Sequence, residues 1–255
     1  MSDRVLGIVP ARIASTRLPR KPLHLLAGRP LIEWVWRRAQ ALGVFDALLV
    51  ATDSQEIASV CAGFGATVEM TSAEHPSGTD RVAEVAARAA WSRYDVVVNV
   101  QGDEPLVTRA TVEGAVRQVS THGWDVGTCA TPLRGPEEWV DPAVVKVVTG
   151  DRGRALYFSR AAIPHPREGA PEWGAAPWLR HLGVYAYRRG ALEAWVALPP
   201  SRLEGVERLE QLRPLEAGIG IGVAVVPEAE GGVDTPEDAL RVERRLIQDM
   251  ESGYV

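Results

Sequence analysis

The sequence predicts an α/β fold with a mostly parallel central sheet. In the first half of the chain, short apolar runs alternate with segments of helical periodicity, a pattern typical of parallel strands joined by crossover helices. Hydrophobic residues make up 46% of the 255 residues, which suffices for a substantial core. The connections are short and no Ser/Gly-rich linker is present, so we expect a single domain over residues 1–255.

The first strand is predicted at Val5–Val9, an apolar run that Pro10 ends. Apolar residues at helical spacing predict a helix over 31–42. The alternation continues with strands at 47–51, 66–70 and 95–100 and with helices at 55–63 and 79–90. Because Val96–Val98 are consecutive β-branched residues, the third of these strands is expected at the centre of the sheet.

From about residue 125 the pattern changes to strands in succession, predicted at 127–131, 144–148, 155–158 and 181–187. Few helical segments separate them, which is typical of antiparallel pairing. We therefore expect a smaller β-rich region at roughly 125–190, followed by a last strand at 221–226 and a closing helix at 236–247. The proline-containing stretch 164–177 lacks periodicity and is the best candidate for a mobile loop.

Composition excludes several classes of protein. The chain has 28 basic and 33 acidic residues, a net charge of −5, and no Lys/Arg block, so nucleic-acid binding is disfavoured. Cys61 and Cys129 lie far apart in the sequence, which predicts buried thiols rather than a disulfide or a zinc site. Pro10 and Arg12 interrupt the N-terminal apolar run too early for a secretory signal, and no stretch reaches the length of a membrane span. We expect a cytoplasmic enzyme without nucleic-acid or membrane partners.

Ligands of open parallel sheets bind beyond the carboxyl ends of the strands, so the segments that follow the strands are the first to consider. Loop 10–22 follows the first strand and combines several arginines with Ser15 and Lys21. Backbone N–H groups and cations in such a loop can share the charges of a polyphosphate. The loop matches neither a Walker A sequence nor a GxGxxG fingerprint, and a solvated basic loop is the competing interpretation.

A second segment, Gln101–Pro105, follows the most apolar strand and contains Asp103. A carboxylate at this position can hold Mg²⁺, which takes a few carboxylates together with phosphate oxygens and water. Asp103 is therefore the first candidate for a metal ligand. The competing interpretation is an ordinary turn aspartate after a glycine.

A third segment, Gly231–Asp238, leads into the closing helix. Thr235 is the natural N-cap and Pro236 the first helical residue, with acidic residues in the first turn. Capping does not require Asp234, so its carboxylate is available as a second metal ligand, unless Asp234 itself caps the helix.

Taken together, the motifs resemble those of the 3-deoxy-manno-octulosonate (Kdo) cytidylyltransferases, also called CMP-Kdo synthetases. The matching stretches follow the family order over almost the whole chain: PARIASTRLPRKPL, HPSGTDRVAEV, VNVQGDEPL, AVVKVV, ALYFSRAAIP, RHLGVYAYR, VERLEQLR and VDTPEDAL. The resemblance implies a Rossmann-like nucleotidyltransferase fold in three layers, with the β-rich region serving sugar binding and homodimerisation. It also implies that CMP passes from CTP to the anomeric hydroxyl of Kdo, with Mg²⁺ as cofactor, for lipopolysaccharide or capsule synthesis.

By resemblance, particular residues take particular roles. The predicted CTP-binding residues are Arg12, Ser15, Lys21, Ser77, Gly78, Thr79, Arg81 and Gln101. The predicted catalytic residues are Lys21, Arg12, Asp103 and Asp234, of which the two aspartates are the metal ligands. The predicted sugar-binding residues are Gln101, Arg160, His181, Tyr185, Glu207, Glu210 and Gln211.

Each predicted sugar residue also has a structural interpretation. His181 and Tyr185 are four residues apart and face one side of the predicted strand, and each can be a half-buried strand residue with a satisfied hydrogen bond. The spacing of Glu207, Glu210 and Gln211 places them on one helix face, which a solvated face explains equally well. Arg160, whose planar fork suits a sugar carboxylate, can instead serve a structural ion pair.

Three departures from the family pattern concern the substrate. Arg20 replaces a usual glycine and adds charge at the phosphate loop, Asp80 replaces a glutamate, and Arg202 replaces a proline. The sugar can therefore be another acid, such as 8-amino Kdo or a sialic acid. The residues are also compatible with a sugar-1-phosphate nucleotidyltransferase, with a non-catalytic nucleotide-binding regulator and with an interaction module.

Overall fold

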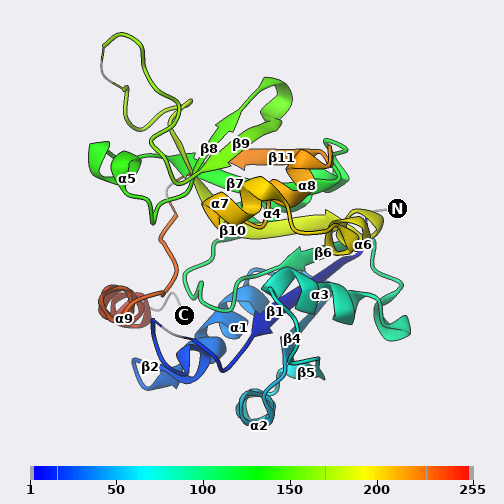
Figure 1. The fold of residues 1–255 in the computed structure, drawn as a ribbon. Helices are drawn as coiled ribbons and strands as arrows, with labels where there is room; N and C mark the ends of the chain where they lie inside the picture. Colours follow the sequence, from blue (N-terminus) through cyan, green and yellow to red (C-terminus); the bar gives the residue numbers. More distant parts are fainter. Residues whose placement is uncertain (1–2, 16, 170, 228, 253–255) are drawn as a thin grey trace. The chain divides into compact units, whose positions relative to one another are not determined.

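The computed structural model describes residues 3–15, 17–169, 171–227 and 229–252. The chain divides into two compact units (Figure 1). Unit 1 consists of Met1–Arg109 with Glu230–Val255, and unit 2 of Ala110–Ala229. The expectation of one domain over the whole chain stays a prediction.

The sheet of unit 1 contains four parallel strands: β1 (Val5–Ala11), β4 (Ala47–Thr52), β5 (Thr67–Met70) and β6 (Val96–Asn99). Their spatial order is β6-β1-β4-β5. The direction in which successive strands are added reverses at β1, because β4 and β5 extend the sheet on one side of it and β6 pairs on the other. Such a switch point is where open α/β sheets bind ligands, outside the carboxyl ends of the strands.

Three helices of unit 1 contact the strands of this sheet, and a fourth contacts a separate short strand. They are α1 (Leu31–Ala41), α2 (Gln55–Gly63), α3 (Gly78–Ala86) and α9 (Pro236–Glu251), with 3₁₀ turns η1 (Lys21–Leu23) and η2 (Ala89–Trp91). A small ribbon of β2 (Leu25–Leu26) and β3 (Arg29–Pro30) contacts α9. Serine N-caps begin α2 and α3, because Ser54 and Ser77 accept hydrogen bonds from the first helical turns.

Unit 2 is built on β7 (Val126–Pro132), β8 (Lys146–Thr149), β9 (Ala155–Ser159), β10 (Leu179–Arg188) and β11 (Ile221–Val225). The pairs β7/β10, β8/β10 and β8/β9 are antiparallel, whereas β11 runs parallel to β7. The remaining elements are α4 (Arg109–Ser120), α5 (Pro136–Val140), η3 (Asp151–Gly153), α6 (Arg189–Ala197), α7 (Arg202–Glu207) and α8 (Leu212–Glu216). The antiparallel region expected after residue 125 is therefore confirmed.

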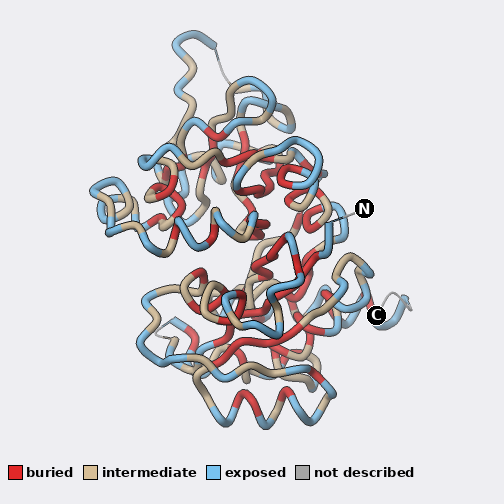
Figure 2. Tube along the Cα trace, turned by 90° about the vertical axis from the view of Figure 1, so that its right-hand side faces the viewer, coloured by how far each residue is buried: buried red, intermediate tan, exposed pale blue. Residues whose placement is uncertain are grey.

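Burial follows the strands and the inward helix faces within each unit (Figure 2). In unit 1, Leu6, Ile8, Val97 and Val98 are fully buried, as a strand covered on both faces requires. Both cysteines are free and buried, as predicted. Among the described residues, no helix is long and apolar enough to cross a bilayer.

Several details differ from the sequence expectations, and two of them concern predicted helical segments. Helix α3 ends at Ala86, four residues before the predicted end, because a 3₁₀ turn follows it at Ala89–Trp91. The single helix face expected for Glu207, Glu210 and Gln211 is wrong, since α7 ends at Glu207 and Arg208 adopts a left-handed conformation with φ of 55°. Glu210 and Gln211 lie in the turn that precedes α8.

Candidate active site

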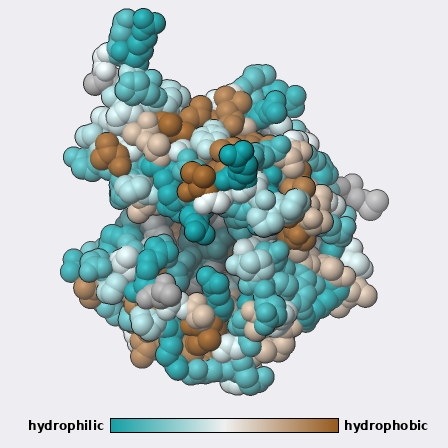
Figure 3. All heavy atoms as spheres, viewed as in Figure 1, coloured by the Kyte–Doolittle hydropathy of each residue, from teal (hydrophilic) through white to brown (hydrophobic). Residues whose placement is uncertain are grey.

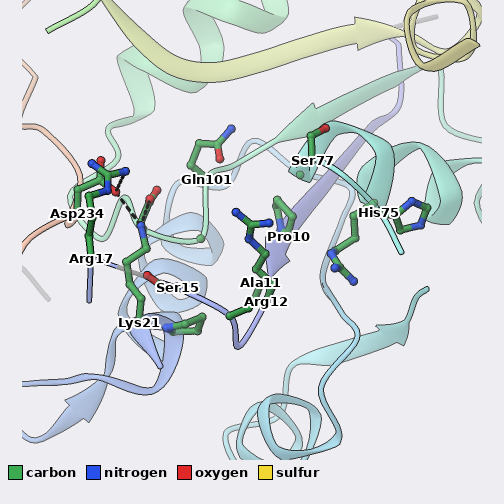
Figure 4. Close-up of a pocket in the computed structure, with 16 residues that line it drawn as sticks. Pro10, Ala11, Arg12, Ser15, Arg17, Lys21, His75, Ser77, Gln101 and Asp234 are labelled. Atoms are coloured by element: carbon green, nitrogen blue, oxygen red, sulfur yellow. Dashed lines mark hydrogen bonds and ion pairs between the residues drawn. The ribbon is translucent and has the colours of Figure 1, made fainter. Parts of the chain in front are cut away.

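A pocket of about 710 Å³ lies at the carboxyl ends of β1 and β6, within unit 1 (Figure 4). Its lining comes from the loop after β1, the start of α3, the turn after β6 and the segment before α9. The lining residues are Pro10, Ala11, Arg12, Ala14, Ser15, Arg17, Lys21, Pro22, His75, Ser77, Gly78, Arg81, Gln101, Gly102, Asp103 and Asp234. The volume is that of an ordinary small-ligand site.

Gly102 allows the two strand ends to approach each other. A Cβ atom at this position would lie 2.5 Å from the carbonyl oxygen of Pro10, a distance at which one backbone would have to move. Glycine therefore brings the turn after β6 against the end of β1. On the other side of the pocket, Ser77 and Gly78 begin α3, whose N–H groups favour an anion or a polar ligand atom.

Lys21 is the central cation of the pocket. Its Nζ lies 2.5 Å from Oδ2 of Asp103 and 3.0 Å from Oδ1 of Asp234. Burial disfavours the charged ammonium, but the attraction and hydrogen bonds of the two carboxylates outweigh this effect and raise the pKa of Lys21. Arg17 adds a second cation, with Nη2 3.0 Å from Oδ1 of Asp234.

The cap of α9 positions Asp234. Thr235 caps the helix and forms a capping box with Asp238, as the sequence predicted for Thr235. The Asp234 N–H also donates to Asp238 Oδ2 at 3.2 Å, while the Val233 N–H donates to the carbonyl of Asp103 at 2.8 Å. Asp234 therefore does not cap the helix, and its carboxylate turns to Lys21.

The carboxylates of Asp103 and Asp234 have the chemistry expected of the predicted magnesium ligands. Both carboxylates converge on one cationic group, and no group of three or more acidic, His or Cys ligands occurs among the described residues. A protein site with two carboxylates suits Mg²⁺, which completes its shell with phosphate oxygens and water.

Of the predicted nucleotide residues, Arg12, Ser15, Lys21, Ser77, Gly78, Arg81 and Gln101 line the pocket together. Thr79 is buried in the first turn of α3 and is not part of the lining. Arg17 and His75 line the pocket but are absent from the predicted set. Both residues lie in stretches that match the family, so their place in these stretches could have identified them as pocket residues.

Arg81 is almost fully buried and firmly held. Its Nη2 donates to Asp53 Oδ2 at 2.8 Å, and its Nη1 donates to Thr71 Oγ1 and to the carbonyl of Ser72. These contacts fix the guanidinium at the wall of the pocket.

Arg20 does not add its charge to this pocket. Its guanidinium pairs with Glu56 in the first turn of α2, and its backbone has φ of 55° at the start of η1. A left-handed backbone favours glycine, the residue that the resemblance leads us to expect at this position.

The predicted sugar residues other than Gln101 lie in unit 2. Glu207 accepts hydrogen bonds from Ser159 Oγ at 2.6 Å and from the Arg160 N–H at 2.9 Å. The Arg160 guanidinium donates to the carbonyls of Glu207 and Pro142, each at 2.8 Å. Arg160 and Glu207 thus form one cluster at the end of β9, and backbone carbonyls already hold part of the guanidinium.

His181 and Tyr185 meet through an irregularity of β10. The register with β7 shifts between Leu182 and Tyr185, and the two rings lie with centroids 5.4 Å apart. His181 Nε2 is 2.9 Å from Thr128 Oγ1, and desolvation lowers the pKa of His181 to about 3, so the ring is neutral. Gln211 is buried before α8, and Glu210 is half-buried next to it.

Comparisons with known proteins agree with this geometry. A family model described as cytidylyltransferase matches residues 6–221. The 3-deoxy-manno-octulosonate cytidylyltransferase of Gemmatimonas aurantiaca is 53% identical over 93% of this chain and 92% of its own length. The enzyme of the same name from Syntrophobacter fumaroxidans is 49% identical over 96% and 98%.

A solved structure of CMP:2-keto-3-deoxy-manno-octonic acid synthetase in complex with CTP is also similar. It has a TM-score of 0.89 and 37% identity, covering 96% of this chain and 99% of that one. The predicted Rossmann-like nucleotidyltransferase fold is confirmed by this likeness. On the sequence identities and the shared fold, the chain belongs to the 3-deoxy-manno-octulosonate cytidylyltransferase family.

Proposed function

We propose that this protein transfers CMP from CTP to the anomeric hydroxyl of Kdo and releases pyrophosphate. The observation that carries the proposal is the convergence of Lys21, Asp103 and Asp234 in a pocket at the switch point of the unit 1 sheet. In this arrangement a nucleoside triphosphate meets cations and metal-binding carboxylates at its phosphates. The identity of the sugar as Kdo and of the base as cytosine is inferred from the names of the relatives reported above.

The reaction requires positioning and charge neutralisation rather than a protein nucleophile. The sugar hydroxyl attacks the α-phosphorus while pyrophosphate leaves on the opposite side. Arg12, Arg17 and Lys21 line the pocket as cations that stabilise the charge of the phosphates. The half-buried state of Lys21 and Asp103 strengthens these interactions over those at a fully solvated surface.

Magnesium is part of the proposal. Asp103 and Asp234 would hold Mg²⁺ together with phosphate oxygens, and the ion would supply neutralisation of charge and acidification of a bound hydroxyl. Lys21, which pairs with both carboxylates in this structure, would then be available to the phosphates. Turnover lost on chelation and restored by Mg²⁺ supports this assignment, whereas unchanged turnover in a chelator contradicts it.

Arg160, His181, Tyr185, Glu207, Glu210, Gln211 and Gln101 are the proposed sugar residues. The Arg160–Glu207 cluster supports this assignment, since a fixed guanidinium suits the Kdo carboxylate. A Kdo analogue such as 8-amino Kdo carries the same carboxylate, so the choice between these sugars requires substrate profiling.

We also propose a cytoplasmic homodimer that acts in lipopolysaccharide or capsule synthesis. Unit 2 exposes Val140, Leu156 and Val206, with 63%, 53% and 81% of their surfaces accessible, and exposed apolar residues are frequent at subunit interfaces. Light scattering tests the dimer, and a monomer at micromolar concentration contradicts it.

The decisive experiment is pyrophosphate release by the purified protein with Mg²⁺. CTP, UTP, ATP and dTTP are each combined with Kdo, 8-amino Kdo and N-acetylneuraminate. Release only with CTP and Kdo establishes the proposed reaction. Release with N-acetylneuraminate alone, or with none of the sugars, contradicts it.

A further inference from the structure

His75 stands at the side of the pocket away from the phosphate cations. Figure 4 shows Lys21, Arg17 and Asp234 grouped together, while Ser77 and His75 lie across the pocket from them. When the triphosphate of CTP lies against the cations, its nucleoside extends toward Ser77 and His75. This step rests on the proposed function.

Glu84 fixes the orientation of the His75 ring. The Nε2 atom lies 2.5 Å from Glu84 Oε2, and the same carboxylate accepts from the Ser72 N–H at 2.9 Å and from Arg88 Nη2 at 2.6 Å. Burial favours the neutral acid, but these hydrogen bonds outweigh it and lower the pKa of Glu84 to about 2.

An ionised carboxylate is only an acceptor, so the ring nitrogen that meets Glu84 carries a proton. In a neutral imidazole, the other nitrogen is then an acceptor. Nδ1 is thus the ring nitrogen that Glu84 does not engage, and because His75 lines the pocket, Nδ1 is the acceptor that this side chain can offer to a ligand.

We propose that His75 selects cytosine over uracil by accepting a hydrogen bond from the exocyclic amine through Nδ1. Cytosine presents an N–H donor at C4, and uracil presents a carbonyl oxygen at the same place. An acceptor on the protein pairs with the first and opposes the second. Sites that hydrogen-bond a substrate group reject analogues without it far better than apolar pockets reject a change in size.

The first test compares kcat/KM for CTP and UTP in the wild type and in His75→Phe at pH 8. We expect the CTP/UTP ratio to fall at least about tenfold, because phenylalanine keeps the ring and removes the acceptor. His122→Phe, at an exposed position of unit 2, is the matched control and keeps the ratio. An unchanged ratio in a folded, active His75→Phe overturns the proposal.

The second test needs no variant at His75. Nitrogen-15 NMR of the wild-type protein at pH 8 is expected to show a protonated Nε2 and an unprotonated Nδ1 for this ring, with a Nδ1 shift on addition of CMP but not of UMP. A protonated Nδ1, or equal shifts with both nucleotides, overturns the proposal. Absence of any CTP turnover by the wild type counts against the proposed function instead, so the two failures are distinguishable.

Discussion

At the scale of single residues, Asp103 and Asp234 share the Lys21 ammonium and carry the charge balance of the pocket. We predict that Asp103→Asn and Asp234→Asn each lower kcat at least about 100-fold, as loss of one electrostatic contact to a transition state typically does. The amide keeps the size of the side chain and removes its charge, so thermal unfolding should change little.

Steady-state kinetics with saturating CTP and Kdo measure the effect. Glu237→Gln is the matched control, because Glu237 is an exposed acid in the first turn of α9. Wild-type kcat in either aspartate variant would remove that residue from the proposed metal site.

Arg20 holds a backbone angle that glycine adopts more readily than arginine. Its φ of 55° is unfavourable for any residue with a Cβ atom, and the exposed pair with Glu56 contributes little, roughly 0.2–1 kcal/mol. We predict that Arg20→Gly has a free energy of unfolding about 1 kcal/mol higher than Arg20→Ala. Both variants lose the pair, so their difference in denaturant unfolding isolates the backbone effect, and equal stabilities would contradict it.

Glu84 gives a pH dependence whose sign follows from its pKa. The folded pKa of about 2 lies below the ordinary value of 4.5, so the stabilisation is complete above about pH 4.5 and is lost as pH falls toward 2. We predict that Glu84→Gln lowers stability at pH 7 and flattens the loss of stability between these pH values. Denaturant unfolding at a series of pH values measures both, and parallel curves for the two proteins would count against the assignment.

At the scale of elements, the start of α9 links stability to the site. Thr235 caps the helix, and Asp238 receives the N–H groups of both Thr235 and Asp234. We predict that Thr235→Ala costs about 1 kcal/mol of stability and also lowers kcat, since Asp234 loses part of its support. Thr235→Ser keeps the hydroxyl and should restore both. A loss of stability without any loss of activity would separate the cap from the site.

Elements with a strong local signal were predictable, and those set by the tertiary structure were not. The strands of unit 1 follow from apolar runs, and helix α2 has the predicted bounds, with Ser54 capping its first turn in the structure. Helix α4 is absent from the predicted elements although Val112, Ala115 and Val119 give it a buried face at helical spacing. The end of α7 before Arg208 has no signal in the sequence. Arginine has a high helix propensity, so nothing in the sequence predicts that Arg208 adopts a left-handed conformation.

The site was predictable to the extent that its residues follow strands or precede helices. Asp103 was predicted because it follows a strand, and Asp234 because it precedes the capping residue of the closing helix. Their common contact with Lys21 required the fold, because 82 and 213 residues separate the partners along the chain. The orientation of His75 depends on Glu84, which belongs to the same matching stretch and lies on α3, but the contact between the two side chains required the fold.

At the scale of the whole molecule, the predicted residues divide between the two units. The nucleotide residues belong to unit 1, and the sugar residues other than Gln101 belong to unit 2. The face in Figure 3 is mainly hydrophilic, with separate hydrophobic patches, so no single apolar surface distinguishes one unit from the other there. The predicted substrate of each unit therefore rests on the chemical character of its predicted binding residues and not on the hydropathy of its surface.

This division predicts that substitutions separate by substrate. Arg12→Ala, in unit 1, should raise KM for CTP at least about tenfold and leave KM for Kdo within about twofold, since it removes a cation from the nucleotide pocket. Arg160→Lys, in unit 2, should do the reverse, because a lysine loses the planar fork while keeping the charge. Its backbone N–H still donates to Glu207, so the fold around β9 is retained. Initial rates over a grid of CTP and Kdo concentrations give KM for CTP and KM for Kdo in each of the two variants. If Arg160→Lys raised KM for CTP and not for Kdo, the assignment of the Arg160–Glu207 cluster to the sugar would be wrong, because loss of a nucleotide contact would then be the simplest account of the variant.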